Sequence, residues 1–172
     1  MSAKPINSIL FVCLGNICRS PLAEGVFRAV WSECAQGREI VLDSAATSGW
    51  EVGSAPDPRS IAVAMGHGID ISGQRARRIA PGDFSRFDLI LGMDRANVRD
   101  LKAVAPPSAA DRIHLYLEFA TGNGGDVPDP YYDGAEAFAS VYRMIREASA
   151  SLAKRLDARA SAPVSGQASS TM

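Results

Sequence analysis

Residues 13–20, Cys-Leu-Gly-Asn-Ile-Cys-Arg-Ser, place a thiol, a guanidinium and a hydroxyl in one short segment. The apolar run of residues 9–12 precedes it and Pro21 follows it, which predicts a loop between a buried strand and a helix N-terminus. Backbone N–H groups of such a loop, with the helix dipole behind them, bind phosphate-like anions. Arg19 can hold two phosphate oxygens, and these positive surroundings favour a thiolate at Cys13. We therefore expect Cys13 to act as a nucleophile in phosphoryl transfer.

Other residues of this loop have supporting roles in the same interpretation. Gly15 is expected to let the backbone curl where a side chain would collide. Ser20 can donate a hydrogen bond to the Cys13 sulfur and help this sulfur leave phosphorus in the second step of the transfer. Leu14 and Ile17 would supply apolar contacts at the mouth of the site. The alternative is that Cys13 is simply a buried apolar residue at a strand end, and the combination with Arg19 and Ser20 argues against that.

A second motif, Pro-Asp-Pro-Tyr-Tyr at residues 128–132, offers a carboxylic acid. A phosphate ester needs a proton on its leaving oxygen, and Asp129 is the candidate to supply it. The flanking prolines would stiffen the segment. Tyr131 and Tyr132 could form one wall of an aromatic slot. The alternative is an ordinary turn, because Asp-Pro is common in turns.

Trp50 is the candidate for the opposite wall of this slot. It lies in residues 45–58, where Gly49, Gly53, Pro56 and Pro58 predict a loop rather than a core position. Apolar walls over a charged floor suit a flat aromatic ring that carries a phosphate. A role in the hydrophobic core is the alternative for Trp50.

The elements that must position these residues alternate along the chain. Ser20 is expected to cap the first helix with Pro21 at its first position, and Asp94 is expected to cap a later one. Strands are predicted at residues 6–12, 40–42, 87–91 and 112–117, and further helices at residues 59–66 and on the face that contains Phe138, Val141, Tyr142, Ile145 and Leu152. This order predicts an α/β fold: a single three-layer domain, a four-stranded parallel sheet with helices on both faces, and a phosphate-binding loop after the first strand.

The chain of 172 residues suits one domain, which we place at residues 1–160. Residues 161–172 are rich in Ser, Ala, Pro and Gly without an apolar period, and they are predicted to be a disordered tail.

Composition excludes several classes of protein. The net charge of −1 gives no overall attraction for nucleic acid, and no apolar run reaches the length of a membrane span. Three cysteines do not build a disulfide scaffold, and two histidines far apart in sequence do not suggest a metal site. We expect no cofactor, no metal, no nucleic-acid or membrane partner, and a cytoplasmic location.

The signature CLGNICRSP after an apolar strand resembles the low-molecular-weight protein tyrosine phosphatases. The resemblance covers residues 6–157 and includes further segments in the family's order: GSAPDPRS (53–60), HGIDISGQRARRI (67–79), FDLILGMDRAN (87–97) and DPYYDG (129–134). It implies a metal-free, two-step hydrolysis of phosphotyrosine through a cysteinyl-phosphate, with Arg19 on the phosphate and Asp129 as general acid and base. The implied partners are phosphotyrosine-containing proteins, with a tyrosine kinase as a candidate, for a monomer or weak dimer.

Four further residues acquire roles only from this resemblance. In the family an Asn at the position of Asn16 supports the loop through a network with a Ser and a His. Asn16 and Ser44 match, but Gln74 stands where the His is expected, and we hypothesise that the network persists with this neutral partner. The resemblance also implies a reversible Cys13–Cys18 disulfide that protects the nucleophile.

Three alternative functions need weighing. Arsenate reductases share the loop but need a resolving cysteine near residues 80–90, and none stands there. Some relatives act on phosphoarginine, for which a hydroxyl in place of Ile17 would be better suited, so Ile17 favours a phenyl ring. A catalytically dead binding module would be expected to lack Cys13, Arg19 or Asp129, and all are present.

Overall fold

The computed structural model describes residues 4–35 and 38–161 of the chain. Its elements, in order, are β1 (Ser8–Cys13), α1 (Arg19–Cys34), β2 (Val41–Ala46), α2 (Pro58–Met65), α3 (Asp83–Arg86), β3 (Leu89–Gly92), α4 (Arg95–Val104), the 3-10 helix η1 (Pro107–Arg112), β4 (Ile113–Leu115), α5 (Tyr116–Thr121) and α6 (Ala135–Ser161). The strands form one sheet in the order β2-β1-β3-β4, and all its pairings are parallel. The predicted fold class is confirmed.

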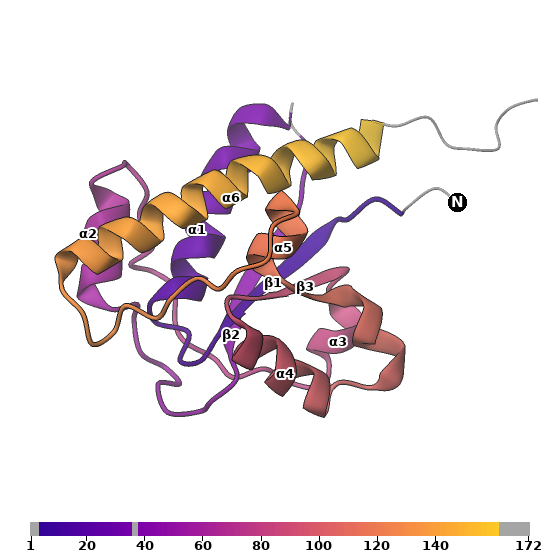
Figure 1. The fold of residues 1–172 in the computed structure, drawn as a ribbon, viewed down its shortest axis with the longest axis horizontal. Helices are drawn as coiled ribbons and strands as arrows, with labels where there is room; N and C mark the ends of the chain where they lie inside the picture. Colours follow the sequence, from indigo (N-terminus) through magenta and orange to yellow (C-terminus); the bar gives the residue numbers. More distant parts are fainter. Residues whose placement is uncertain (1–3, 36–37, 162–172) are drawn as a thin grey trace, which may run out of the picture.

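Helices lie on both faces of this sheet (Figure 1). Alternate residues of β1 show why: Ile9 and Phe11 pack into a core with α1, α5 and α6, whereas Leu10 and Val12 pack into a second core with α3, α4 and η1. A strand buried on both faces is a continuous apolar run, as β1 is. The short α2 lies beside α6 at one end of the molecule (Figure 1).

The order of the strands places a crevice at the carboxyl end of β1. The chain leaves β1 toward α1 on one face and leaves β3 toward α4 on the other face. In an open parallel sheet, ligands bind where neighbouring connections diverge in this way. The loop at residues 14–18, after β1, is therefore at the switch point of the sheet.

The start of α1 differs from the prediction. The N-cap position is Cys18, with no side-chain cap, so Ser20 lies inside the helix and Pro21 follows it. The Ser20 hydroxyl does not cap because it is 3.0 Å from the Cys13 sulfur and accepts a hydrogen bond from Asn16. The Asp94 prediction is confirmed: its carboxylate accepts from the Asn97 N–H within a capping box at the start of α4.

Strand lengths also differ, for reasons of pairing. β2 extends beyond the predicted residues 40–42 because Ser44, Ala45 and Ala46 continue the ladder to the end of β1. The strand predicted at residues 112–117 ends at Leu115 because its partner β3 ends at Gly92. Without a neighbour to pair with, the chain turns into α5, which the sequence did not predict. The short elements α3 and η1 were also missed.

The last helix continues through Ser161, and the rest of the predicted tail, residues 162–172, is outside the described residues. Within residues 4–35 and 38–161, no helix is long and apolar enough to span a bilayer.

Candidate active site

A cavity of about 180 Å³ opens at the carboxyl end of β1. Its lining combines the loop after β1, the loop after β2 and the segment before α6. The residues that line it are Cys13, Leu14, Gly15, Ile17, Cys18, Arg19, Trp50, Glu51, Asp129, Tyr131 and Tyr132. The structure thus brings together the thiol, the guanidinium, the carboxylate and the aromatic rings that the sequence singled out.

The Cys13 sulfur lies at the base of this cavity and receives several hydrogen bonds. The backbone N–H groups of Asn16 and Ser20 donate to it at 3.3 and 3.5 Å. The Ser20 hydroxyl lies 3.0 Å from the same sulfur. Donors aimed at a sulfur atom at a helix N-terminus stabilise the negative charge of a thiolate.

Asn16 has the unusual backbone of the loop. Its φ of 59° lies in the left-handed region, which non-glycine residues rarely adopt. The structure differs here from the expectation for Gly15, whose φ is not positive and where an added Cβ would meet only ordinary contacts at 3.6 Å or more. The Asn16 side chain compensates for the strain, because its amide donates to Ser20 and Ser44 and its oxygen accepts the Arg77 N–H.

Ser44, at the end of β2, continues this network into the core. Its hydroxyl accepts from Asn16 at 3.0 Å and lies 2.8 Å from a Glu24 carboxylate oxygen. Gln74 lies farther away, 3.4 Å from the same hydroxyl, and its amide donates to the Pro21 carbonyl at 3.0 Å. Gln74 therefore touches the network as expected, but its contact with Ser44 is the weaker one.

Glu24 is the network residue that the sequence reasoning missed. It projects from α1, is almost fully buried and also accepts from Arg28 at 3.0 Å. Burial raises the pKa of Glu24, although the hydrogen bonds from Ser44 and Arg28 oppose this. A charged residue between Ala23 and Val26 on an otherwise apolar stretch of helix was the signal that could have identified it.

The Arg19 side chain is buried and fixed along one edge. Its Nη1 donates to Asp94 Oδ2 at 2.7 Å and to the Val127 carbonyl at 3.0 Å. Burial alone would lower the pKa of Arg19, but the Cys13 sulfur and Asp94 outweigh it and hold this pKa above its ordinary value. The other edge differs, because Arg19 Nε is buried and has no hydrogen-bond partner among the described residues. A buried N–H without a partner costs about 1–3 kcal/mol, so this edge favours an acceptor such as a phosphate oxygen.

Asp129 reaches the same space from the segment before α6. One carboxylate oxygen lies 3.7 Å from Arg19 Nη2, and the other accepts the Tyr131 N–H at 3.1 Å. The side chain is 42% exposed, so one face of the carboxylate is open to the cavity and to water. Such a group can exchange protons with a molecule bound above Cys13.

Aromatic rings form the mouth of the cavity. Trp50 is 82% exposed and Tyr132 is 92% exposed, which contradicts a core role for Trp50. Tyr131 and Tyr132 contact each other edge to face, with ring centres 4.9 Å apart. Large apolar rings left in solvent at a cavity mouth are typical of a surface that binds another molecule.

Comparisons with known proteins agree with this geometry. The family model described as low molecular weight phosphotyrosine protein phosphatase matches residues 8–162. The chain belongs to this family. As a member of this phosphatase family it is a phosphoric monoester hydrolase, as the sequence predicted.

Individual relatives of this phosphatase chain are similar over most of their length. A low molecular weight phosphotyrosine protein phosphatase of Schizosaccharomyces pombe is 42% identical over 78% of this chain and 86% of its own. One from Sus scrofa is 41% identical over 83% of this chain and 91% of its own. The crystal structure of a protein tyrosine phosphatase from Entamoeba histolytica matches with a TM-score of 0.81 and 34% identity, covering 87% of this chain and 96% of that one.

Two further acidic residues of the candidate site in this phosphatase were not predicted to belong to it. Glu51 lines the cavity beside Trp50. Asp94 was expected only as a helix cap, yet it also holds Arg19. No local pattern could have shown the second role, because Arg19 and Asp94 are 75 positions apart.

Cys18 also lines the cavity but differs from Cys13. Burial, together with the nearby Asp57 carboxylate, raises the pKa of Cys18 to about 12. Both cysteines are free thiols in the structure. Cys18 is therefore a protonated thiol at neutral pH, and it is a poor nucleophile in this state.

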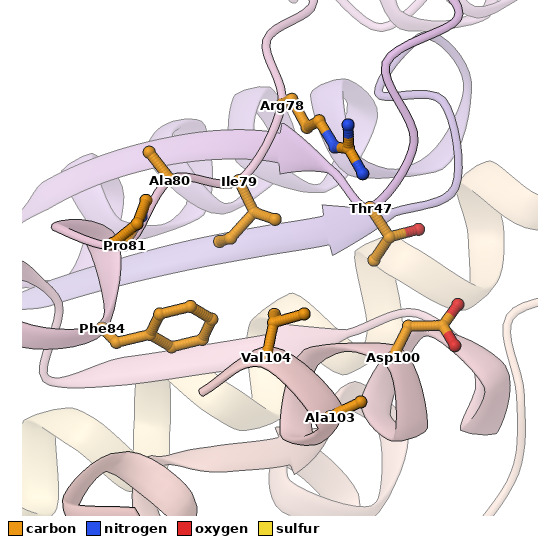
Figure 2. A pocket seen from close by; sticks show the side chains of 9 residues that line it. All are labelled: Thr47, Arg78, Ile79, Ala80, Pro81, Phe84, Asp100, Ala103 and Val104. Atoms are coloured by element: carbon orange, nitrogen blue, oxygen red, sulfur yellow. The ribbon is translucent and has the colours of Figure 1, made fainter. Parts of the chain in front are cut away.

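A larger hollow of about 540 Å³ lies away from these residues, between the 78–81 segment, α3 and α4 (Figure 2). Its floor is apolar, with Ile79, Phe84 and Val104, and Arg78 and Asp100 project at its edge (Figure 2). It contains no thiol and none of the predicted site residues, so its size does not make it the reaction site. In the described part of the chain, no group of three or more His, Cys, Asp or Glu side chains could hold a metal ion.

Proposed function

We propose that this phosphatase hydrolyses phosphotyrosine in protein substrates through a cysteinyl-phosphate intermediate. The observation that carries the proposal is the buried Nε of Arg19, which has no partner among the described residues. Arg19 lines the same cavity as Cys13, whose sulfur receives hydrogen bonds from the N–H groups of Asn16 and Ser20. A phosphate oxygen would satisfy that donor, and phosphorus would then lie above the sulfur. The loop N–H groups and the start of α1 would share the remaining negative charge.

In the first step the Cys13 thiolate attacks phosphorus, and the bond from phosphorus to the phenolic oxygen breaks. Asp129 gives its proton to that oxygen, so tyrosine leaves neutral. Arg19 and the loop amides hold the three other oxygens throughout. The carboxylate that faces the cavity from the segment before α6 supports this role for Asp129.

In the second step water attacks the cysteinyl-phosphate. Asp129, now ionised, takes a proton from the water, and the bond from sulfur to phosphorus breaks. The hydroxyl of Ser20, 3.0 Å from the sulfur, stabilises the thiolate as it leaves. The products are inorganic phosphate and the enzyme in its starting state.

The substrate class follows from the walls of the site. Trp50, Tyr131 and Tyr132 offer flat apolar faces, and Ile17 adds a branched apolar side chain at the mouth. These groups suit a phenyl ring better than the polar guanidino group of phosphoarginine. We expect phosphotyrosine proteins as substrates and a tyrosine kinase as the enzyme that supplies them. A cytoplasmic location and a monomer or weak dimer stay predictions.

The Cys13–Cys18 pair is also proposed to protect the enzyme against peroxide. Peroxide would oxidise the Cys13 thiolate to a sulfenic acid. The Cys18 sulfur would then attack that sulfur, and its proton would leave with the displaced hydroxide as water. Because the pKa of Cys18 is about 12, this closure needs its proton to be removed during the attack. Inactivation by peroxide that a thiol cannot reverse would contradict this role.

The test is hydrolysis of para-nitrophenyl phosphate at mildly acidic pH with EDTA present. Wild type is expected to turn the substrate over with a bell-shaped pH profile, and Cys13→Ser is expected to be inactive. Asp129→Asn is expected to lose about 10²–10⁴-fold in rate, the usual contribution of general acid–base catalysis. No turnover by folded, fully reduced wild type would refute the proposal. Equal turnover of phosphoarginine and phosphotyrosine peptides would refute its substrate class.

A further inference from the structure

Arg59, in the first turn of α2, lies outside the lining of the cavity but hydrogen-bonds to the segment that carries Asp129. Its Nη1 donates to the Asp133 carbonyl and its Nη2 to the Tyr131 carbonyl, both at 3.0 Å. The guanidinium also lies over the ring of Phe138, 4.4 Å from its centre. One planar group thus holds the chain at two points shortly after Asp129.

Few other hydrogen bonds connect this segment to the rest of the domain. Within the described part of the chain, the hydrogen bonds that residues 128–134 form to other segments are those from Arg59 and one from Ala137 in α6 to the Gly134 carbonyl. Arg19 approaches Asp129 only at 3.7 Å. Among the described side chains, Arg59 is therefore the one that hydrogen-bonds the backbone of this segment to another part of the domain.

Asp57 fixes Arg59 in turn. Its carboxylate oxygens accept from Arg59 Nε and Nη2 at 3.0 and 2.9 Å, a fork-to-fork pair. These hydrogen bonds hold the pKa of Asp57 below its ordinary value, so the pair stays ionised at neutral pH. The Asp57 side chain is only 9% exposed, which restricts its motion.

The other end of this pair is attached to the loop after β1. The Asp57 N–H donates to the Ile17 carbonyl at 2.8 Å, and the hydroxyl of Ser60 donates to the Cys18 carbonyl at 3.1 Å. The start of α2 is thus joined to the loop that surrounds the Cys13 sulfur. Asp57 and Arg59 connect the segment with the acid to the loop with the nucleophile.

We propose that Arg59, held by Asp57, is a positioning residue that sets the place of Asp129 over the phosphate bound above Cys13. This inference rests on the proposed function and adds a residue to it. A general acid must lie within hydrogen-bond reach of the leaving oxygen, and a displacement of about 1 Å can cost about 10²-fold in rate. Lysine would keep the charge of Arg59 but not its planar fork, so it could not hold Asp57, Tyr131 and Asp133 together.

The distinguishing readout is the dependence on the leaving group. Phenolate is a poorer leaving group than para-nitrophenolate, so its departure depends more strongly on a proton from Asp129. The parameter kcat/KM reports the step that forms the cysteinyl-phosphate. Misplacement of Asp129 lowers kcat/KM for phenyl phosphate more than for para-nitrophenyl phosphate. A loss of folded enzyme lowers both equally.

The experiment compares wild type, Arg59→Ala, Arg59→Lys and Asp129→Asn on both substrates, with thermal unfolding to verify the fold. Arg143→Ala, which removes an exposed arginine on α6, is the matched control. Both Arg59 variants are expected to raise the ratio of kcat/KM for para-nitrophenyl phosphate to that for phenyl phosphate by about 10-fold or more. In the Asp129→Asn background, Arg59→Ala is expected to leave the ratio unchanged, because the group that it positions is already gone.

Each outcome decides between the inference and its alternatives. An unchanged ratio in Arg59→Lys and Arg59→Ala, while Asp129→Asn raises it, overturns the positioning role and leaves the proposed function intact. The positioning role is also overturned if Arg59→Ala changes the ratio by the same factor in wild type and in the Asp129→Asn background. Should Arg59→Ala fail to fold, Arg59→Lys decides alone. Wild type without activity, or Asp129→Asn with an unchanged ratio, refutes the proposed function itself.

Discussion

At the scale of single residues, the environment of the Cys13 sulfur depends on the direction of a few hydrogen bonds. With Glu24 ionised, its carboxylate accepts the Ser44 proton, so the Ser44 oxygen is free to accept from Asn16. The other Asn16 amide proton goes to Ser20 Oγ, which leaves the Ser20 hydroxyl proton for the Cys13 sulfur. A buried carboxylate on α1 therefore orients donors toward a sulfur that it does not touch.

Glu24 leads to a prediction about stability and pH. Because burial raises its pKa above the ordinary 4.5, the folded protein holds this proton more tightly than the unfolded chain. The stability that this group contributes is fully present below pH 4.5 and is lost as pH rises through the raised folded pKa. The stability of wild type relative to Glu24→Gln is thus expected to fall as pH rises through this range. The fall is about 1.4 kcal/mol for each unit by which the pKa of Glu24 in the folded protein exceeds that in the unfolded chain.

Urea unfolding of both proteins at a series of pH values measures this difference. If wild type instead gains stability over Glu24→Gln as pH rises, the hydrogen bonds from Ser44 and Arg28 outweigh the cost of burial, and the direction of the pKa shift is reversed.

At the scale of elements, Asp94 at the beginning of α4 has two roles: it caps the helix and it holds Arg19. One carboxylate oxygen caps the helix by accepting the Asn97 N–H at 2.8 Å, and the other holds Arg19 at 2.7 Å. A helix on one face of the sheet thereby fixes Arg19, which belongs to a helix on the other face. The carboxyl ends of β1 and β3 are neighbours, which makes this contact feasible.

Two substitutions at Asp94 separate these tasks. Asparagine caps helices about as well as aspartate, whereas alanine does not, so Asp94→Ala is expected to be about 1 kcal/mol less stable than Asp94→Asn. Both variants lose the ionic partner of Arg19, and we expect about the same loss of kcat/KM in each, on the order of 10-fold. Urea unfolding and hydrolysis of para-nitrophenyl phosphate measure the two effects. Full activity in Asp94→Asn would show that the carboxylate acts on catalysis only through the helix cap.

At the scale of the whole molecule, the sheet and its two cores hold the donors of the proposed anion site close together. Arg19 is buried with its Nε unpartnered among the described residues, and the N–H groups of Asn16 and Ser20 point at the Cys13 sulfur. Because only the folded sheet brings these donors together, an anion that they bind has affinity for the folded state and not for the unfolded chain, and it stabilises the whole domain.

Inorganic phosphate is therefore expected to raise the melting temperature. At about 100 times its Kd the stabilisation is about 2.7 kcal/mol, which corresponds to about 5–10 °C for a chain of this size. Arg19→Ala is expected to show no such shift, and sodium chloride at matched ionic strength is the control for screening. Thermal unfolding followed by circular dichroism measures the effect. An equal shift in wild type and Arg19→Ala would mean that phosphate binds elsewhere.

The sequence by itself determined what depends on neighbours along the chain. The alternation of apolar strands and helices predicted the parallel sheet, and the segment from Cys13 to Ser20 predicted the anion loop, because both follow from local periodicity and local backbone donors. The Asp94 cap was predictable for the same reason. These are short-range effects that a linear pattern carries.

Only the tertiary structure decided what depends on residues far apart in sequence. Glu24 beneath Ser44, Asp94 beside Arg19, and Arg59 on the Tyr131 carbonyl join segments that only the folded sheet brings together. The same is true of boundaries, since the end of β4 is set by where β3 ends. Ser20 shows how a tertiary contact can override a local preference. Its sequence position favours capping a helix, but in the folded protein its hydroxyl contacts the Cys13 sulfur and accepts from the Asn16 amide instead.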